Sequence, residues 1–174
     1  MLYSPPSDAA IFMTNQKSVA ILGAGAWGKA LATLAQTNAH NVRIFSRRGS
    51  QTLAQTVEGA DIILSAVSMK GVRDIVSQLK SLPISPHTIF VTATKGLDRE
   101  TTCTPSQIWQ ENFSHNRVVV LCGPNLSKEI TQELPAATVV ASNIENAAES
   151  VQLVFNSTRF RVYTNSDPLG VELG

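Results

Sequence analysis

The chain has 174 residues, with 14 Lys and Arg against 13 Asp and Glu, so its formal net charge at pH 7 is +1. Hydrophobic residues make up 43% and charged residues 16%, which excludes disorder on composition, and the balanced charge gives no reason to expect a nucleic acid or an anionic membrane as partner. No apolar run approaches the ~18 residues of a membrane span, and no secretory signal precedes the first strand. Cys103 and Cys122 lack disulfide or metal-ligand spacing. We therefore expect a cytoplasmic protein without a metal site.

Short β-branched runs alternate with longer helical patterns along the chain. The first run, Ser18 to Leu22, is apolar on both faces, which is typical of a buried strand. Thr104 and Pro105 resemble an N-cap followed by a proline in the first helical position. The expected strands cover residues 18–22, 41–46, 61–67, 88–94, 117–121, 136–142 and 160–164. The expected helices cover residues 27–37, 70–82 (ended by Pro83), 105–112, 126–134 and 144–156, and Ser166 is expected to cap a last one.

This alternation predicts the fold class. Strands separated by helical crossovers at this spacing form α/β units, here a doubly wound, mostly parallel Rossmann-type sheet. We expect residues 1–16 to be a flexible N-terminal extension and residues 17–165 to be a single Rossmann-type domain. Residues 166–174 resemble the first turns of an apolar helix leading into a further domain, because a natural terminus is usually polar and frayed. A short docked C-terminal helix is the alternative.

A glycine-rich turn joins the first strand to the first helix. Residues 23–28 read GAGAWG, which matches G-x-G-x-x-G in the strand–turn–helix context that gives the motif its meaning. Gly23 permits the tight turn, Gly25 lets the backbone approach a pyrophosphate, and Gly28 lets the helix lie close to the strand. Ala26 and Trp27 complete the turn, whose free N–H groups favour phosphate. The alternative is a glycine-rich turn without a ligand.

The end of the second strand indicates which dinucleotide would bind. An NAD site usually has Asp or Glu there, but no acidic residue occurs between Asp8 and Glu58. The strand ends instead in Ser46, Arg47 and Arg48. Guanidinium groups pair with a ribose 2′-phosphate that a carboxylate would repel, so these residues favour NADP(H) over NAD(H). A solvated surface pair of arginines is the alternative.

Two later strands end at the same edge of a parallel sheet, where ligands of such sheets bind. Lys95 follows the fourth strand, and we expect it to direct a cation into the crevice near a developing negative oxygen. Gly123 follows the fifth strand and allows a close backbone approach before the next helix. An exposed lysine and an ordinary turn are the alternatives.

Five segments carry a resemblance to a known family. The sequence resembles the N-terminal half of the bacterial-type NAD(P)-dependent glycerol-3-phosphate dehydrogenases. The segments are GAGAWGKALA (23–32), ATKGLDRET (93–101), CGPNLSKEI (122–130), LPAATVVAS (134–142) and FRVYTNSDPLGVELG (160–174). They span almost the whole chain in the family's order, and the resemblance implies that residues 17–165 are an NAD(P)-binding Rossmann domain.

The resemblance implies a reaction and a set of contacts. The reaction is reversible hydride transfer between NADPH and dihydroxyacetone phosphate, which gives glycerol 3-phosphate for phospholipid synthesis. The resemblance also admits NAD(H) as a cofactor and implies a homodimer of the full-length protein. Its cofactor contacts fall on Trp27, Arg47, Arg48, Lys95 and Ser127. Its substrate contacts fall on Lys95, Gly123 and Asn125.

Two departures from the family are visible. Only residues 49–60 connect Arg48 to the third strand, where the family usually has a longer segment. The family's catalytic lysine, in a helical second domain, lies beyond Gly174, so no catalytic residue is assigned in this chain.

Two other interpretations stay open: a different NADP-dependent reductase of the ketopantoate or 6-phosphogluconate type, and a stand-alone dinucleotide-sensing module.

Overall fold

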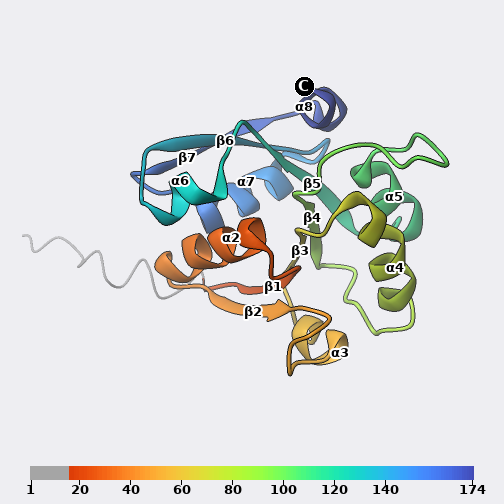
Figure 1. The fold of residues 1–174 in the computed structure, drawn as a ribbon. Coiled ribbons are helices and arrows are strands. Elements are labelled where there is room, and N and C mark those ends of the chain that lie inside the picture. The colour runs from red at the N-terminus through yellow and green to blue at the C-terminus, as the bar shows by residue number, and fades with distance from the viewer. Residues whose placement is uncertain (1–15) are drawn as a thin grey trace, which may run out of the picture.

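The computed structural model describes residues 16–174, which form one seven-stranded sheet covered by helices on both faces (Figure 1). The strands are β1 (Ser18–Leu22), β2 (Asn41–Phe45), β3 (Ile62–Ser65), β4 (Ile89–Thr92), β5 (Arg117–Cys122), β6 (Ala136–Ala141) and β7 (Phe160–Asn165). The helices are α2 (Ala26–Thr37), α3 (Leu53–Val57), α4 (Met69–Leu79), α5 (Pro105–Asn112), α6 (Ser127–Thr131), α7 (Glu145–Phe155) and α8 (Pro168–Leu173). The predicted doubly wound, mostly parallel sheet is therefore confirmed.

The strand order places a crevice beside β1. The order is β2-β1-β3-β4-β5-β6-β7, so β2 and β3 lie on opposite sides of β1. The crossover after β1 leads to β2 and the crossover after β3 leads to β4, so the two leave in opposite directions at the neighbouring carboxyl ends of β1 and β3. In open α/β sheets this is where ligands bind. The predicted glycine turn lies at this point.

One strand pair departs from parallel pairing. β6 runs antiparallel to β5, with Leu121 opposite Val140, and β7 then runs parallel to β6. The cause is the short connection after β5. Helix α6 has five residues and is about 7.5 Å long, whereas the six residues of β5 span about 20 Å. The chain therefore does not return to the amino end of the sheet and enters β6 from the opposite direction.

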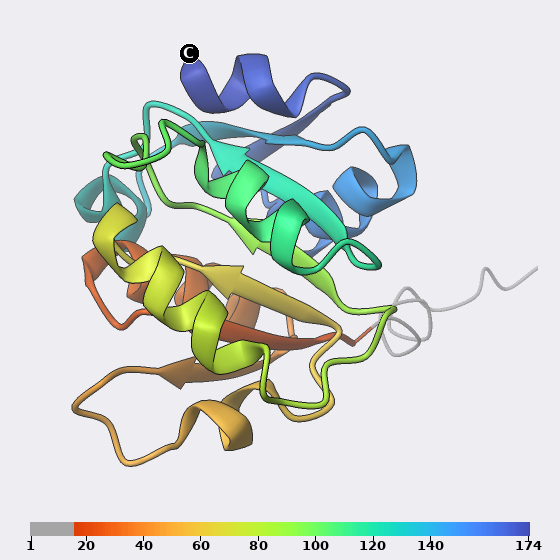
Figure 2. The same ribbon diagram turned by 90° about the vertical axis from the view of Figure 1, so that its right-hand side faces the viewer.

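Alternate strand residues separate the core into two layers. In β1, Val19 and Ile21 join the cluster under α2, α6 and α7, whereas Ala20 and Leu22 join the cluster under α3, α4 and α5. Figure 2 shows α4 and α5 side by side on the second face. A strand that is buried on both faces needs an apolar run without polar alternation, which is what the sequence shows.

Helix α3 is the element that the sequence did not predict. Thr52 and Gln55 form a capping box, and Leu53 and Val57 are buried. Arg43 of β2 holds the helix, because its guanidinium donates to the carbonyl oxygens of Gln55 and Glu58 at its end. The short connection between β2 and β3 is therefore an ordered part of the wall.

Some expected boundaries are wrong. Helix α4 ends at Leu79, three residues before Leu82, and the chain makes a tight turn before it reaches Pro83. Asp167, not Ser166, caps α8, because its carboxylate accepts a hydrogen bond from the amide of Gly170 at 2.9 Å. The expected extension, residues 1–16, lies outside the described residues except for Gln16, whose side chain donates to the carbonyl of Ala39.

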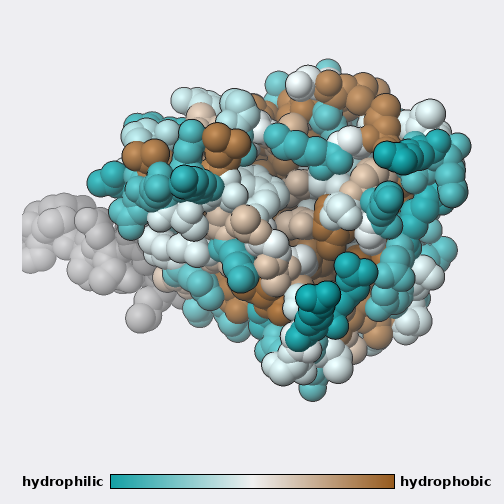
Figure 3. Space-filling view, in the orientation of Figure 1, coloured by the Kyte–Doolittle hydropathy of each residue, from teal (hydrophilic) through white to brown (hydrophobic). Residues whose placement is uncertain are grey.

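Helix α8 lies on the surface of the domain. None of its residues is buried, and Leu169 and Leu173 are exposed. Figure 3 shows hydrophobic surface over this helix at the top of the molecule. The carboxylate of Glu172 accepts hydrogen bonds from both the amide and the hydroxyl of Ser106, in the first turn of α5. This contact joins α8 to the helix that follows β4.

Candidate functional site

The carboxyl ends of four adjacent strands form one continuous edge. The amide of Ala66 donates to the carbonyl of Leu22 at 2.8 Å, which joins the ends of β1 and β3. The hydroxyl of Thr94 donates to the carbonyl of Val67, which joins the ends of β3 and β4. Since β5 pairs with β4 in parallel, the glycine turn and the segments after β4 and β5 lie along a single edge.

The glycine turn leaves no room for side chains at its two ends. Gly23 has a φ of +117°, and a Cβ there would lie 2.7 Å from the carbonyl oxygen of Ala66. At Gly28 a Cβ would lie 1.9 Å from the carbonyl oxygen of Gly23. The tight turn and the close approach of helix to strand, which the sequence predicted for these positions, are both present.

The middle glycine is different, because it faces open space. No heavy atom lies within 4 Å of a Cβ built on Gly25. Gly25 is the N-cap of α2, and no side chain caps this helix. Because the first intrahelical bond runs from the Lys29 amide to the Gly25 carbonyl, the amides of the preceding turn are free for an anion. These features fit the pyrophosphate of a dinucleotide.

Two arginines stand free at the end of β2. Ser46 and Gly49 close a turn through a 3.0 Å bond from the Gly49 amide to the Ser46 carbonyl, and Arg47 and Arg48 occupy its exposed corner. Among residues 16–174, neither guanidinium has a hydrogen bond or an ion pair, in contrast to Arg43, which supports α3. The two side chains are thus available to a ligand at the edge next to the glycine turn.

The predicted residues after β4 and β5 lie together. Lys95 Nζ donates a hydrogen bond to the carbonyl oxygen of Gly123 at 2.9 Å. The side-chain nitrogen of Asn125 is buried without a hydrogen-bond partner among the described residues. A Cβ on Gly123 would lie 2.8 Å from that nitrogen and 3.1 Å from the hydroxyl of Thr138. A buried amide with unused donors next to an exposed ammonium group is an arrangement that can bind oxygen atoms of a ligand.

Sequence reasoning missed Thr138 as a neighbour of this cluster. Its hydroxyl donates to the carbonyl of Cys122 at 3.0 Å, from the antiparallel strand β6. Nothing in the sequence gives the register of β6 against β5, so the contact was not predictable. The position contributes a buried hydroxyl beside Gly123.

Ala26, Trp27 and Ser127 are three further residues that the sequence predicts as cofactor contacts. Trp27 is half-buried and packs against the core cluster under α2, and Ala26 is exposed. Ser127 is the first residue of α6, two residues after Asn125. These positions lie on the same edge, and their roles toward a cofactor remain predictions.

The loop after Lys95 is fixed by charge. The guanidinium of Arg73, in α4, donates to both carboxylate oxygens of Asp98, at 2.6 and 3.2 Å. Hydrogen bonds from Arg73 and Thr101 hold the pKa of Asp98 well below its usual range. This loop belongs to the segment ATKGLDRET (93–101) that carries the family resemblance, but the ion pair of Asp98 with Arg73 was not predicted.

Comparisons with known proteins identify the family. The family model described as "NAD-dependent glycerol-3-phosphate dehydrogenase N-terminus" matches residues 18–53 and 48–148. The chain belongs to this family. The two matched segments meet in the connection between β2 and β3, which is the one that the sequence shows to be short. Membership decides against a reductase of the ketopantoate or 6-phosphogluconate type.

The relatives agree with this assignment. The chain is 66% identical over 160 residues to the glycerol-3-phosphate dehydrogenase [NAD(P)+] of Nostoc sp., covering 92% of this chain and 52% of that protein. It is 67% identical over 160 residues to the same enzyme of Trichormus variabilis, with the same shares. The crystal structure of glycerol-3-phosphate dehydrogenase from Coxiella burnetii superposes with a TM-score of 0.83 at 27% identity, over 91% of this chain and 56% of that one.

The chain spans about half the length of the curated relatives that it matches. The matched half contains the sheet and its carboxyl edge. Among residues 16–174, every helix is too short or too polar to span a bilayer.

Proposed function

We propose that the chain is the cofactor-binding half of a glycerol-3-phosphate dehydrogenase and binds NADP(H) at the carboxyl edge of its sheet. The observation that carries the proposal is the glycine turn, which is closed by backbone at Gly23 and Gly28 and open at Gly25. The amides of Ala26 and Trp27 would hold the pyrophosphate at the start of α2. Favourable helix-dipole interactions support a negative group there.

The free arginines support a preference for NADP(H) over NAD(H). Arg47 and Arg48 would pair with a ribose 2′-phosphate, and Ser46 would donate to the same group. A guanidinium–phosphate pair is bidentate and charge-assisted, which makes it stronger than a neutral hydrogen bond. The absence of any carboxylate between Asp8 and Glu58 removes the usual partner of an unphosphorylated ribose.

The cluster after β4 and β5 would serve the substrate. We propose that Lys95, Gly123 and Asn125 contact dihydroxyacetone phosphate or glycerol 3-phosphate, and that Lys95 and Ser127 also contact the cofactor. When bound, the reduced nicotinamide supplies the hydride for reduction of the ketone. The ammonium of Lys95 would stabilise the negative charge that develops on the oxygen, and the hydrogen bond to Gly123 would hold it in place. The product would supply phospholipid synthesis in the cytoplasm.

The proton-transferring lysine and most of the substrate-phosphate site would come from outside residues 1–174. We therefore expect the 174-residue chain to bind the cofactor and to turn over poorly. Near-normal dehydrogenase activity of this chain alone would contradict that division of labour. Cofactor binding by the 174-residue chain alone can be tested directly.

The direct test is a titration of the chain with NADPH and with NADH, followed by nicotinamide fluorescence. We expect saturable binding of both, with tighter binding of NADPH. The matched control is the Gly25→Val variant, whose side chain would occupy the open space at the helix start. Absence of saturable binding by the folded chain, or equal binding by the variant, would remove the proposed site.

A further inference from the structure

A polar cavity lies at the end of the sheet opposite to the carboxyl edge. It has a volume of about 220 Å³ and opens between helix α7 and the amino ends of β1, β3, β4 and β5. Its polar lining comprises Lys17, Asp61, His87, Arg117 and Ser150. Ile62 and Ile89 form an apolar floor. The dinucleotide edge is at the carboxyl ends of the same strands, so the two places are separated by the length of the sheet.

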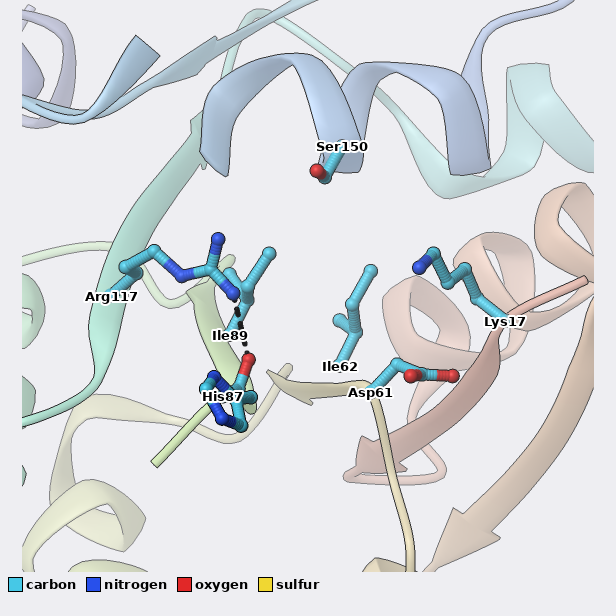
Figure 4. A pocket seen from close by; sticks show the side chains of 7 residues that line it. All are labelled: Lys17, Asp61, Ile62, His87, Ile89, Arg117 and Ser150. Atoms are coloured by element: carbon cyan, nitrogen blue, oxygen red, sulfur yellow. Dashed lines mark hydrogen bonds between the residues drawn. The ribbon is translucent and has the colours of Figure 1, made fainter. Parts of the chain in front are cut away.

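Two cations face each other across this cavity. Figure 4 shows the guanidinium of Arg117 and the ammonium of Lys17 pointing into it from opposite sides. Arg117 uses one terminal nitrogen in a 2.8 Å bond to the carbonyl of His87, which orients the group and leaves its other N–H donors free. Among residues 16–174, the ammonium of Lys17 has neither a hydrogen bond nor an ion pair. Both residues are half-buried.

The nearby carboxylate does not neutralise either cation. Asp61 accepts a 2.7 Å hydrogen bond from the backbone amide of Ser18, and no ion pair within 4.0 Å joins it to Lys17 or Arg117. The hydroxyl of Ser150 donates to the carbonyl of Asn146, so it offers no proton to a ligand. The polar lining therefore has two cations, Lys17 and Arg117, against one carboxylate, and these cations and the imidazole of His87 have unused hydrogen-bonding groups among the described residues.

We propose that this cavity binds a small phosphate monoester. A planar guanidinium pairs with phosphate through two parallel hydrogen bonds, and the ammonium of Lys17 adds positive charge on the other side of the cavity. The volume of about 220 Å³ is several times the ~30 Å³ that a water molecule takes in the liquid, so a phosphate group has room there. The floor of Ile62 and Ile89 would contact a short carbon chain on the ester.

The test is an amide NMR titration of the 174-residue chain with glycerol 2-phosphate and, in a parallel arm, with sodium acetate. We expect glycerol 2-phosphate to shift the amides of Lys17, Ile89, Arg117 and Ser150 in a saturable manner, and acetate to shift them far less. Amides at Gly25 and Lys95 report on the other edge. Shifts confined to those two segments would overturn the proposal. Equal shifts with acetate would overturn the phosphate class.

Three charge-neutralising variants make the assignment specific. Lys17→Gln and Arg117→Gln should each weaken binding by about tenfold or more, because each removes a charged hydrogen-bond donor. Arg161→Gln is the matched control, since Arg161 is exposed on β7 and has no hydrogen bond among the described side chains. If Lys17→Gln, which leaves the Arg117–His87 bond untouched, binds as tightly as the control, the proposal is wrong.

Discussion

The ammonium group of Lys95 donates a hydrogen bond to the carbonyl oxygen of Gly123 at 2.9 Å, which connects the chain after β4 to the chain after β5. The bond matters because Lys95 is exposed and has a long, flexible side chain. A fixed acceptor on the neighbouring strand restricts the positions of the charge. Gly123 also leaves space for the side chain of Asn125, because a Cβ at position 123 would lie 2.8 Å from its nitrogen. Strand order alone thus places a cation and a buried amide next to each other.

This relationship predicts the effect of removing the charge. Lys95→Met should weaken NADPH binding by about tenfold or more, because a hydrogen bond to a charged group contributes about 1.5–3 kcal/mol. The melting temperature should change little, since the side chain is exposed. Fluorescence titration and thermal unfolding measure the two quantities. Lys80→Met, at the end of α4, is the control, and an equal effect from both variants would exclude Lys95 from the site.

The two outer positions of the glycine turn predict a stability defect. In Gly28→Ala the new Cβ would lie 1.9 Å from the carbonyl oxygen of Gly23, so helix α2 must move away from β1. Overpacking of this kind costs about 1–3 kcal/mol, and each kcal/mol lowers the melting temperature by roughly 2–4 °C in a domain of this size. Thermal unfolding without any cofactor is the measurement. An unchanged melting temperature would show that the turn has more freedom than the structure gives it.

The middle position predicts the opposite pattern. Gly25 has a φ of −68° and a ψ of 177°, which an L-residue adopts without strain, and its Cβ would point into open space. Gly25→Val should therefore keep the melting temperature and lose NADPH binding, because the side chain would occupy the space at the helix start. Comparison of the variant with Gly28→Ala separates a binding defect from a folding defect. A variant that loses both properties would contradict the assignment of Gly25 to the ligand.

These glycines show how much of the site was readable from the sequence. The motif spacing alone predicted the close packing at Gly23 and Gly28, because it follows from the strand–turn–helix geometry, and the role of Gly25 toward a pyrophosphate stays a prediction. Helix α3 was missed because its five residues are too few for a helical period to appear. The contact of Thr138 with the cluster after β5 depends on an antiparallel register that arises only when the short α6 fails to return the chain. The register between strands that are distant in the sequence is set by packing, which cannot be predicted from a local sequence pattern.

The arginines at the end of β2 predict a change of cofactor preference. Arg47→Asp should weaken NADPH binding by at least about tenfold and leave NADH binding nearly unchanged, since the new carboxylate repels only the 2′-phosphate. The backbone turn from Ser46 to Gly49 does not use the side chain, so the fold should persist. Parallel titrations with both coenzymes measure the ratio. Arg99→Asp, another exposed arginine, is the matched control, and an unchanged ratio in Arg47→Asp would remove this residue from the site.

The bond between Glu172 and Ser106 predicts a local opening. Glu172 accepts from the amide of Ser106 at 3.0 Å and from its hydroxyl, while α8 buries none of its own residues. Glu172→Ala should accelerate hydrogen exchange in α8 and at the start of α5 and leave exchange in β1 and β3 unchanged. Glu172→Gln, which keeps an acceptor oxygen, should show a smaller effect. Glu149→Ala on the exposed side of α7 is the control. Equal exchange in both alanine variants would contradict the prediction that Glu172 holds α8 against α5.

His40 predicts how stability depends on pH. Burial is the main cause that lowers the pKa of His40 below 6.5, and its Nδ1 accepts a 3.1 Å hydrogen bond from the backbone amide of Lys17. Protonation of Nδ1 would remove that acceptor. Because the unfolded chain binds the proton more readily, the contribution of His40 to stability is fully present above pH 6.5 and falls as the pH drops from 6.5 toward the lower folded pKa.

The measurement is the melting temperature between about pH 5 and pH 8, for the wild type and for His40→Gln, with the imidazole shift of His40 followed by NMR. His87 and His115 are common to both proteins, so their contributions cancel in the difference. We expect the wild type to lose more stability than the variant as the pH falls below 6.5, and the imidazole to titrate below that value. Titration at or above 6.5 would show that the Lys17–His40 contact tolerates the proton, and the difference between the two curves should then vanish or change sign.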